Sequence, residues 1–259
     1  VFSYRDAEMF SRKAVETGRE VKIHIAADTG MCRIGYVPSP EAIEEVKKIA
    51  DLPGITMQGI FTHFSEADIA DKEWAHEQHS RFSAFIDALK GAGVTFNIHH
   101  CCNSAGTLEL PDFHRDMIRP GIIQYGYDAS KEVLVTGTKI KPVMSLRCCI
   151  THLKTIYEGD CVGYGRHFTA KGPTKIATLP IGYADGYNRA LSSKIDVIVH
   201  GVRAHQVGNI CMDQCMIDVS HIPNVKVGDE VVLFGEQGSE CVSADEIADT
   251  CHTIIHEIT

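Results

Sequence analysis

Four motifs follow one another in the second half of the chain: CVGYGRHF (161–168), LPIGYADGYNR (179–189), VGNICMDQCMIDVS (207–220) and VGDEVVLFG (227–235). Glycines flank Tyr164 in the first motif, so the backbone there can approach a bulky group closely. From about residue 139 onward, short β-prone runs alternate with Gly, Asp and Pro turns, and a helical pattern occurs only near 244–255. This pattern predicts a mainly β domain over residues 139–259.

Residues 1–138 instead alternate helical and strand patterns. The helical patterns cover 3–18, 39–52 and 71–93, and the apolar strand patterns cover 21–28, 55–64, 95–103 and 116–126. Near-continuous apolar strands between helices are typical of a parallel sheet covered by helices. A closed (β/α)8 barrel needs eight such strands, so four strands predict part of a barrel. The predicted fold class is α/β plus β: strands 5–8 of a (β/α)8 barrel, followed by a C-terminal β-domain.

The composition excludes several classes of protein. A net charge of −9 argues against nucleic acid and against an anionic membrane surface as partners. No run approaches the roughly 20 apolar residues that a membrane-spanning helix needs. The first residues lack the apolar segment of a secretory signal, so we expect a cytoplasmic protein.

Ten cysteines and fourteen histidines raise the question of a metal site or a disulfide framework. The chain has no C-x-x-C pair and no H-E-x-x-H motif. We therefore expect reduced thiols and no bound metal. The adjacent pairs Cys101–Cys102 and Cys148–Cys149 are each expected to point to opposite faces of a strand.

The four motifs, in this order and spacing, resemble those of the alanine racemase family, and the resemblance covers essentially the whole chain. It implies a pyridoxal-phosphate (PLP) enzyme that interconverts L- and D-alanine with two bases and so supplies D-alanine for peptidoglycan. It also implies a head-to-tail homodimer, in which the β-domain of one subunit covers the barrel of the other. Tyr164 corresponds to one of the two bases.

The second base of the family is the lysine that carries PLP, on the first barrel strand. No stretch like A-x-x-K-A-x-A-Y-G occurs in the 259 residues. We therefore expect that the chain starts after that strand and that it is inactive by itself. The rival hypothesis is a non-enzymatic chain, such as a truncated remnant that binds something else.

In the first half, the resemblance assigns roles to residues at the ends of predicted strands. Arg33, in the turn DTGMCRIG (28–35), would reach the phenolic oxygen of PLP and the substrate carboxylate. His63 would hydrogen-bond the catalytic tyrosine. Arg119 would hydrogen-bond the pyridine nitrogen of PLP without giving it a proton, because arginine stays protonated. The expected cofactor contacts around the phosphate are Asn103, Ser104, Gly121 and Ile122.

Each of these residues also has an ordinary interpretation when it is taken alone. Arg33 and Arg119 could be surface charges, and His63 a structural histidine at a strand end. Asn103 and Ser104 together form a helix start signal. Likewise, Tyr164 alone could lie on a β surface, and CMDQ (211–214) could be an unremarkable strand and turn.

The resemblance also places substrate contacts in the second half. The Met212 backbone N–H, with Asp213, corresponds to the loop that binds the substrate carboxylate. Tyr183 and Arg189 correspond to the gate of the substrate channel. His256 stands where the family usually has a tyrosine that touches the phosphate. A subgroup with a polar residue there accepts serine, so a broader alanine/serine racemase remains an alternative.

Three further departures concern charge and geometry. Ala26 stands where many members of the family have a carbamylated lysine. In those members the lysine positions the arginine that corresponds to Arg33. We therefore expect that Arg33 is either held by another group or an ion, or positioned more loosely. Cys32 stands where glycine is usual. Asn209 follows Gly208 where the family often has an arginine, so the gate has lost one charge.

Overall fold

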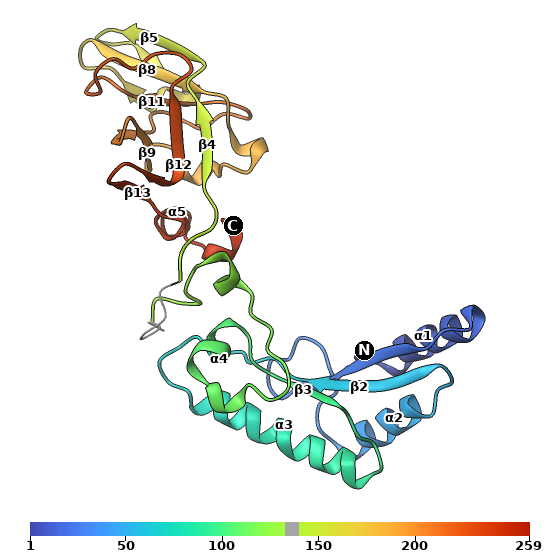
Figure 1. Cartoon of the computed structure of the whole chain (residues 1–259). Helices are drawn as coiled ribbons and strands as arrows, with labels where there is room; N and C mark the ends of the chain where they lie inside the picture. Colours follow the sequence, from blue (N-terminus) through green and yellow to red (C-terminus); the bar gives the residue numbers. More distant parts are fainter. Residues whose placement is uncertain (133–139) are drawn as a thin grey trace. The chain divides into compact units, whose positions relative to one another are not determined.

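The computed structural model describes residues 1–132 and 140–259, which form two compact units, Val1–Lys141 and Pro142–Thr259 (Figure 1). The predicted boundary between residues 138 and 139 lies outside the described residues.

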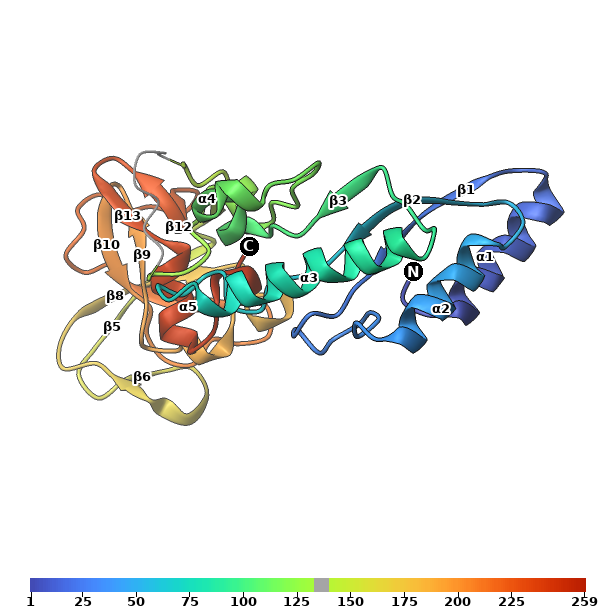
Figure 2. The same ribbon diagram turned by 90° about the horizontal axis from the view of Figure 1, so that it is seen from below.

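The first unit is built on a parallel sheet with the strand order β1-β2-β3. Its strands are β1 (Val21–Ala26), β2 (Ile55–Phe61) and β3 (Ile98–His100). Helix α1 (Tyr4–Thr17) precedes β1, whereas α2 (Pro40–Ala50) and α3 (Glu73–Gly91) connect the strands and cover the same face of the sheet (Figures 1 and 2). This is the predicted helix-covered parallel sheet.

Apolar side chains between the sheet and the helices form the core of the first unit. Ile25 and Ile60, from paired positions of β1 and β2, are fully buried against Val46, Ile49 and Phe82 of the helices. The Ser39–Pro40 start signal works as expected, because the Ser39 side chain accepts a hydrogen bond from Ala42 N–H at the first turn of α2.

The prediction of a strand over 116–126 is wrong. That segment follows the line of β3 with only two backbone hydrogen bonds, from Asp116 N–H to His99 C=O and from Arg119 N–H to Cys102 C=O. Pro120 has no N–H to continue the ladder, and the chain turns into the short 3₁₀ helix η2 (Ile122–Tyr125). The described sheet therefore has three strands rather than four, and the partial barrel remains a prediction.

Two short helical elements lie between β3 and that segment. Strand β3 ends at His100, three residues earlier than predicted, and α4 (Ser104–Glu109) begins after a three-residue link. A 3₁₀ turn, η1 (Pro111–Phe113), follows α4. The link therefore has no strand alternation, which matters for the two cysteines within it.

The second unit is mainly β, and its described strands pair antiparallel. One sheet has the order β10-β9-β12-β13, with β4 also paired to β12; a second has the order β11-β8-β5; β6 and β7 form a separate pair. The strands are β4 (Leu146–Cys149), β5 (His152–Ile156), β6 (Cys161–Val162), β7 (Phe168–Thr169), β8 (Thr174–Leu179), β9 (Asp196–Val199), β10 (Val202–His205), β11 (Cys215–Asp218), β12 (Glu230–Gln237) and β13 (Glu240–Val242).

Helical structure in the second unit is short. The predicted helix near 244–255 is α5 (Ala244–Cys251), whose N-terminus is capped by Ser243. Four 3₁₀ turns complete the unit: η3 (Tyr164–Arg166), η4 (Tyr183–Asp185), η5 (Arg189–Leu191) and η6 (Ile255–Glu257).

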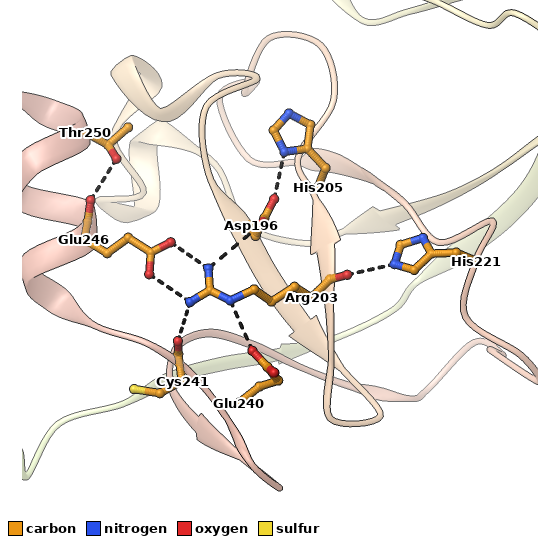
Figure 3. A network of polar contacts seen from close by, with 8 residues as sticks. All are labelled: Asp196, Arg203, His205, His221, Glu240, Cys241, Glu246 and Thr250. Carbon is orange, nitrogen blue, oxygen red and sulfur yellow. Dashed lines mark hydrogen bonds and ion pairs between the residues drawn. The ribbon is translucent and has the colours of Figure 1, made fainter.

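Arg203 on β10 joins α5 to the sheet and links β10 with β13 of the same sheet (Figure 3). Its guanidinium donates two hydrogen bonds to the Glu246 carboxylate, at 2.7 and 3.0 Å, and one to Glu240 at 3.2 Å. It also donates to the carbonyl oxygen of Cys241 at 2.5 Å. The paired hydrogen bonds between the guanidinium and the carboxylate fix the orientation of the two groups as well as pairing their charges.

None of the described helices is long and apolar enough to cross a membrane.

Candidate active site

The carboxyl ends of the three parallel strands carry a chain of polar side chains that centres on Arg119. Its Nη1 lies 2.5 Å from His100 Nδ1, and His100 Nε2 lies 2.8 Å from His24 Nδ1. A guanidinium can only donate hydrogen bonds, so the Nδ1 atom of His100 is the acceptor. The single proton of the neutral His100 ring is therefore on its Nε2 atom. That proton is then donated to His24. Burial, followed by the charge of Arg119, lowers the pKa of His100 to about 3, which agrees with a neutral ring.

Backbone carbonyls hold the other side of the Arg119 guanidinium. Its Nη2 donates to Thr62 C=O at 2.8 Å and to Cys101 C=O at 3.2 Å. The guanidinium also lies over the ring of Phe61, 5.3 Å from the ring centre. Arg119 is thus a fixed cation at the end of the sheet, with its direction set by contacts from β2, β3 and their extensions.

His63 and Arg33 belong to the same cluster. Arg119 Nη2 lies 3.4 Å from His63 Nδ1. Burial, then the charges of Arg119 and Arg33, lower the pKa of His63 to about 4, so this ring is neutral at pH 7. The charge of Arg33 also contributes to lowering the pKa of Arg119, after burial. The structure therefore brings together three residues that the sequence predicted to share a site.

The turn that carries Arg33 is organised by Asp28. The carboxylate oxygen Oδ1 accepts hydrogen bonds from the backbone N–H groups of Gly30 and Cys32, at 3.0 and 2.9 Å. Cys32 has a φ of 54°, in the left-handed region that favours glycine. A cysteine at this position therefore adds backbone strain that glycine would not. The Arg33 side chain is exposed and makes no hydrogen bond or ion pair within residues 1–132 and 140–259.

The predicted phosphate contacts lie where α4 begins. Ser104 is buried, and its Oγ accepts a hydrogen bond from Gly121 N–H at 2.8 Å, so the two groups are adjacent. Ile122 starts η2, and the first N–H groups of a helix have no partner within that helix. Asn103 caps α4 by accepting from Gly106 N–H, as the helix-start interpretation requires. A hydroxyl and N–H groups beside a fixed cation suit a ring that bears a phosphate.

In the second unit, Tyr164 lies on a tight turn. Gly163 and Gly165 have φ values of 68° and 77°, which residues with side chains rarely adopt. The Asn209 side chain donates to Tyr164 C=O at 2.8 Å and fixes the turn from the neighbouring loop. Tyr164 is 75% exposed. Asn209, which the sequence suggested only as a lost charge, therefore supports the turn that presents Tyr164.

The same neighbouring loop also meets the turn that carries Tyr183. Gly182 is packed so closely that an added Cβ would lie 2.3 Å from Cys211 O and 2.4 Å from Met212 O. Tyr183 N–H donates to Cys211 C=O at 3.0 Å. Loop 207–213 thus contacts the turns that carry Tyr164 and Tyr183, and three motifs that are separate in the sequence converge.

The remaining predicted residues are exposed on the second unit. Met212 and Asp213 are exposed on loop 207–213, and Arg189 starts η5. His256 is exposed on η6, and both of these 3₁₀ turns pack against α5.

Sequence reasoning missed the residues that orient Arg119. His24, Thr62 and His100 hold it directly or through one intermediate, yet each resembled an ordinary strand residue. The one available signal was the repeated placement of polar residues in otherwise apolar strands, as in VKIHIAAD (21–28) and TFNIHHCCN (95–103). Within residues 1–132 and 140–259, no three His, Cys, Asp or Glu side chains gather as they would around a metal ion.

Comparison with known proteins identifies the family. The model described as alanine racemase, N-terminal domain, matches residues 1–129, and that described as alanine racemase, C-terminal domain, matches residues 143–259. The chain belongs to the alanine racemase family. This confirms the resemblance inferred from the motifs.

Individual relatives agree with this assignment. Alanine racemase 1 of Clostridium acetobutylicum is 46% identical over 258 residues, which cover 100% of this chain and 67% of that protein. The solved alanine racemase of Clostridium difficile 630 superposes with a TM-score of 0.93 at 38% identity, over 100% of this chain and 66% of that one. A histidine racemase from Leuconostoc mesenteroides has a TM-score of 0.90 at 26% identity, over 100% and 68%. The chain thus spans about two thirds of the length of these relatives.

Proposed function

We propose that the protein containing this chain is a PLP-dependent alanine racemase that interconverts L- and D-alanine. The family assignment supports the reaction, and its relatives include proteins named alanine racemase at 43–46% identity. The structural observation that supports the cofactor is the fixed Arg119 cation beside the Ser104–Gly121 pair. We further propose a cytoplasmic enzyme that supplies D-alanine for peptidoglycan.

The residues at the strand ends suit PLP. When bound, PLP withdraws electrons from the substrate and so eases removal of the α-proton. Arg119 would donate to the pyridine nitrogen and keep its own proton, because a guanidinium does not titrate near neutral pH. Because Arg119 keeps its proton, the pyridine nitrogen would stay unprotonated, and this favours simple return of a proton to Cα. Ser104, with the N–H groups of Gly121 and Ile122, would hold the phosphate, and Asn103 supports them as the cap of α4.

Substrate orientation and proton transfer are assigned to the remaining residues. Arg33 would bind the substrate carboxylate, together with Met212 N–H and Asp213. Tyr164 would move the α-proton on one face, and His63 would be its hydrogen-bond partner. A tyrosine has an ordinary pKa of about 10, so this role requires stabilisation of the phenolate by nearby positive charge.

The proposed enzyme is a head-to-tail homodimer whose barrel includes the sheet β1-β2-β3. Its second base is a lysine of the family motif A-x-x-K-A-x-A-Y-G, which the 259 residues do not contain. We therefore expect this chain alone to bind PLP without turning alanine over. Absence of PLP binding, seen as an unchanged pyridoxal absorbance spectrum on titration, would favour the non-enzymatic alternative.

The decisive experiment changes Tyr164 in a protein that also supplies the lysine motif. Tyr164→Phe should slow exchange of the α-hydrogen with solvent by ~10²–10⁴-fold from one alanine enantiomer and much less from the other, because one base is lost. Tyr157→Phe is the matched control, since Tyr157 is a similarly exposed tyrosine of the same unit, at 62%. Equal, near-wild-type exchange from both enantiomers would show that Tyr164 is not a base.

A broader alanine/serine racemase is the second candidate function, and His256 is the observation that favours it. An exposed polar side chain on η6 stands where the family usually has tyrosine. A pocket distinguishes groups as similar as methyl and hydroxymethyl by only ~1–3 kcal/mol. His256→Tyr should therefore raise the alanine-to-serine ratio of kcat/KM. A ratio that stays the same, measured with both substrates at one pH, would remove His256 from the specificity determinants.

A further inference from the structure

Two Cys-Cys dipeptides in this chain have different geometries. Cys101 and Cys102 are both fully buried, and their Sγ atoms lie 3.2 and 3.3 Å from the same oxygen, Phe113 C=O. Both thiols donate to this one carbonyl oxygen, so the two sulfurs face the same point. The prediction that they point to opposite faces of a strand is wrong, because β3 ends at His100 and the link to α4 has no strand alternation.

The second dipeptide keeps the geometry of a strand. Cys148 and Cys149 lie within β4, paired with Val231 and Glu230 of β12. Successive side chains of a strand point to opposite faces, and here Cys149 is exposed whereas Cys148 is half-buried. The chain therefore contains one convergent and one divergent pair of adjacent thiols, and the second is a built-in control for the first.

We propose that Cys101 and Cys102 form a bidentate dithiol site for trivalent arsenicals and similar thiophilic ligands. With an aryl arsenoxide, two As–S bonds form and the As=O bond breaks. The oxygen leaves as water with the two thiol protons, and arsenic stays trivalent. Since both sulfurs belong to adjacent residues and face one point, the second bond forms at a high effective concentration.

The surroundings of the pair assist the first bond. The hydrogen bond from Cys102, then the charges of Arg115 and Arg119, lower the pKa of Cys101 despite its burial, whereas the pKa of Cys102 is raised. The thiolate is the reactive form of cysteine. Either thiol can form the first bond, and its neighbour then completes the ring.

The site lies inside the frame that positions Arg119 and Ser104. Cys101 C=O accepts from the Arg119 side chain, Cys102 C=O accepts from Arg119 N–H, and Asn103 follows directly as the cap of α4. A ligand on the two sulfurs must displace Phe113 C=O and strain this link. We expect faster amide exchange at Arg119 and Gly121 in the adduct, because their N–H groups donate to Cys102 C=O and Ser104 Oγ.

The test uses phenylarsine oxide on the folded 259-residue chain, with mass spectrometry to locate the adduct. We expect one adduct, on the peptide with Cys101 and Cys102, that 2,3-dimercaptopropanol removes and excess 2-mercaptoethanol does not. Cys101→Ser and Cys102→Ser should each weaken binding roughly 100-fold or more, because one bond replaces two. The double variant Cys148→Ser/Cys149→Ser should bind as the wild type does.

Reactivity and folding are controlled separately. The denatured chain should take the reagent at both dipeptides, because neither geometry survives there. A native chain with no adduct, an adduct at 148–149, or unchanged binding by either single-serine variant would each overturn the proposal. If a serine variant does not fold, differential alkylation of the wild type decides instead. The arsenical must then protect Cys101 and Cys102 together, and protection of only one also overturns the proposal.

Discussion

Among single residues, the histidines of the first unit carry a pH dependence that can be tested. Burial, and then the charge of Arg119 or Arg115, lowers the pKa values of His63, His79 and His100 to about 4, 4 and 3. These rings stay neutral in the folded chain at pH 7. In the unfolded chain each has a pKa of about 6.5.

We therefore predict that the first unit loses stability as the pH falls from about 6.5 to 4. In that window the unfolded chain binds more protons than the folded chain, so the free energy of unfolding decreases, and it is fully recovered above pH 6.5. Urea unfolding of the chain across this range, with NMR of the imidazole protons, checks the prediction. A His63 or His100 ring that titrates near pH 6.5 in the folded chain would contradict it.

The residue scale also shows where sequence reasoning stops. Arg119 could be singled out because its family role is tied to a motif. The hydrogen-bonded chain through His100 to His24 could not, because it joins residues 76 positions apart and exists only once β1, β2 and β3 are paired. The left-handed backbone at Cys32 is a conformation that favours glycine, which agrees with the expectation drawn from the family resemblance at that position.

At the scale of elements, Arg203 is the residue whose loss should be felt most directly. Arg203→Ala removes the hydrogen bonds to Glu246, which join α5 to the sheet, and to Glu240, which link β10 with β13 (Figure 3). Hydrogen bonds to charged groups contribute more than neutral ones, but the Arg203 side chain is 34% exposed, which reduces the effect. We predict a loss of about 1–2 kcal/mol in the unfolding free energy of the second unit, with earlier amide exchange in α5.

Arg147 provides the matched control for that prediction. It forms an ion pair with Glu230 at 2.9 Å on the same sheet, and its side chain is 45% exposed. Arg147→Ala should change the unfolding free energy by less than about 0.5 kcal/mol. If the two variants are equally stable in urea, the Arg203 cluster does not hold α5 in place.

The elements themselves were predicted unevenly from the sequence. Helices α1, α2 and α3 were predicted well, since each shows helical periodicity and two begin at a serine cap. The prediction of a fourth strand failed because the apolar residues of 116–126 were given more weight than Pro120, which cannot donate to the ladder and precedes the turn into η2. The convergence of Cys101 and Cys102 was missed for a related reason, because it depends on where β3 ends.

On the scale of the whole molecule, the structure has two units of different construction, Val1–Lys141 and Pro142–Thr259. The first has a parallel sheet whose edges are β1 and β3, and β3 has only three residues. In the second, β12 is paired with β4, β9 and β13, and its residues Val231 and Val232 are fully buried. Open edges of a parallel sheet invite pairing with another chain, whereas buried, doubly paired strands resist opening.

We therefore predict that backbone amides of β9 and β12 exchange much more slowly than those of β1 and β3 in the intact 259-residue chain. Isolated residues 1–138 should aggregate or remain molten, and residues 139–259 should keep most of their protection. Hydrogen exchange followed by mass spectrometry measures this for each strand, and sedimentation shows whether the chain is a monomer. Uniform, strong protection of both units in a proven monomer would contradict this prediction. It would mean that the edges of the sheet β1-β2-β3 are covered, which a partial barrel does not explain, and the partial-barrel proposal would be wrong.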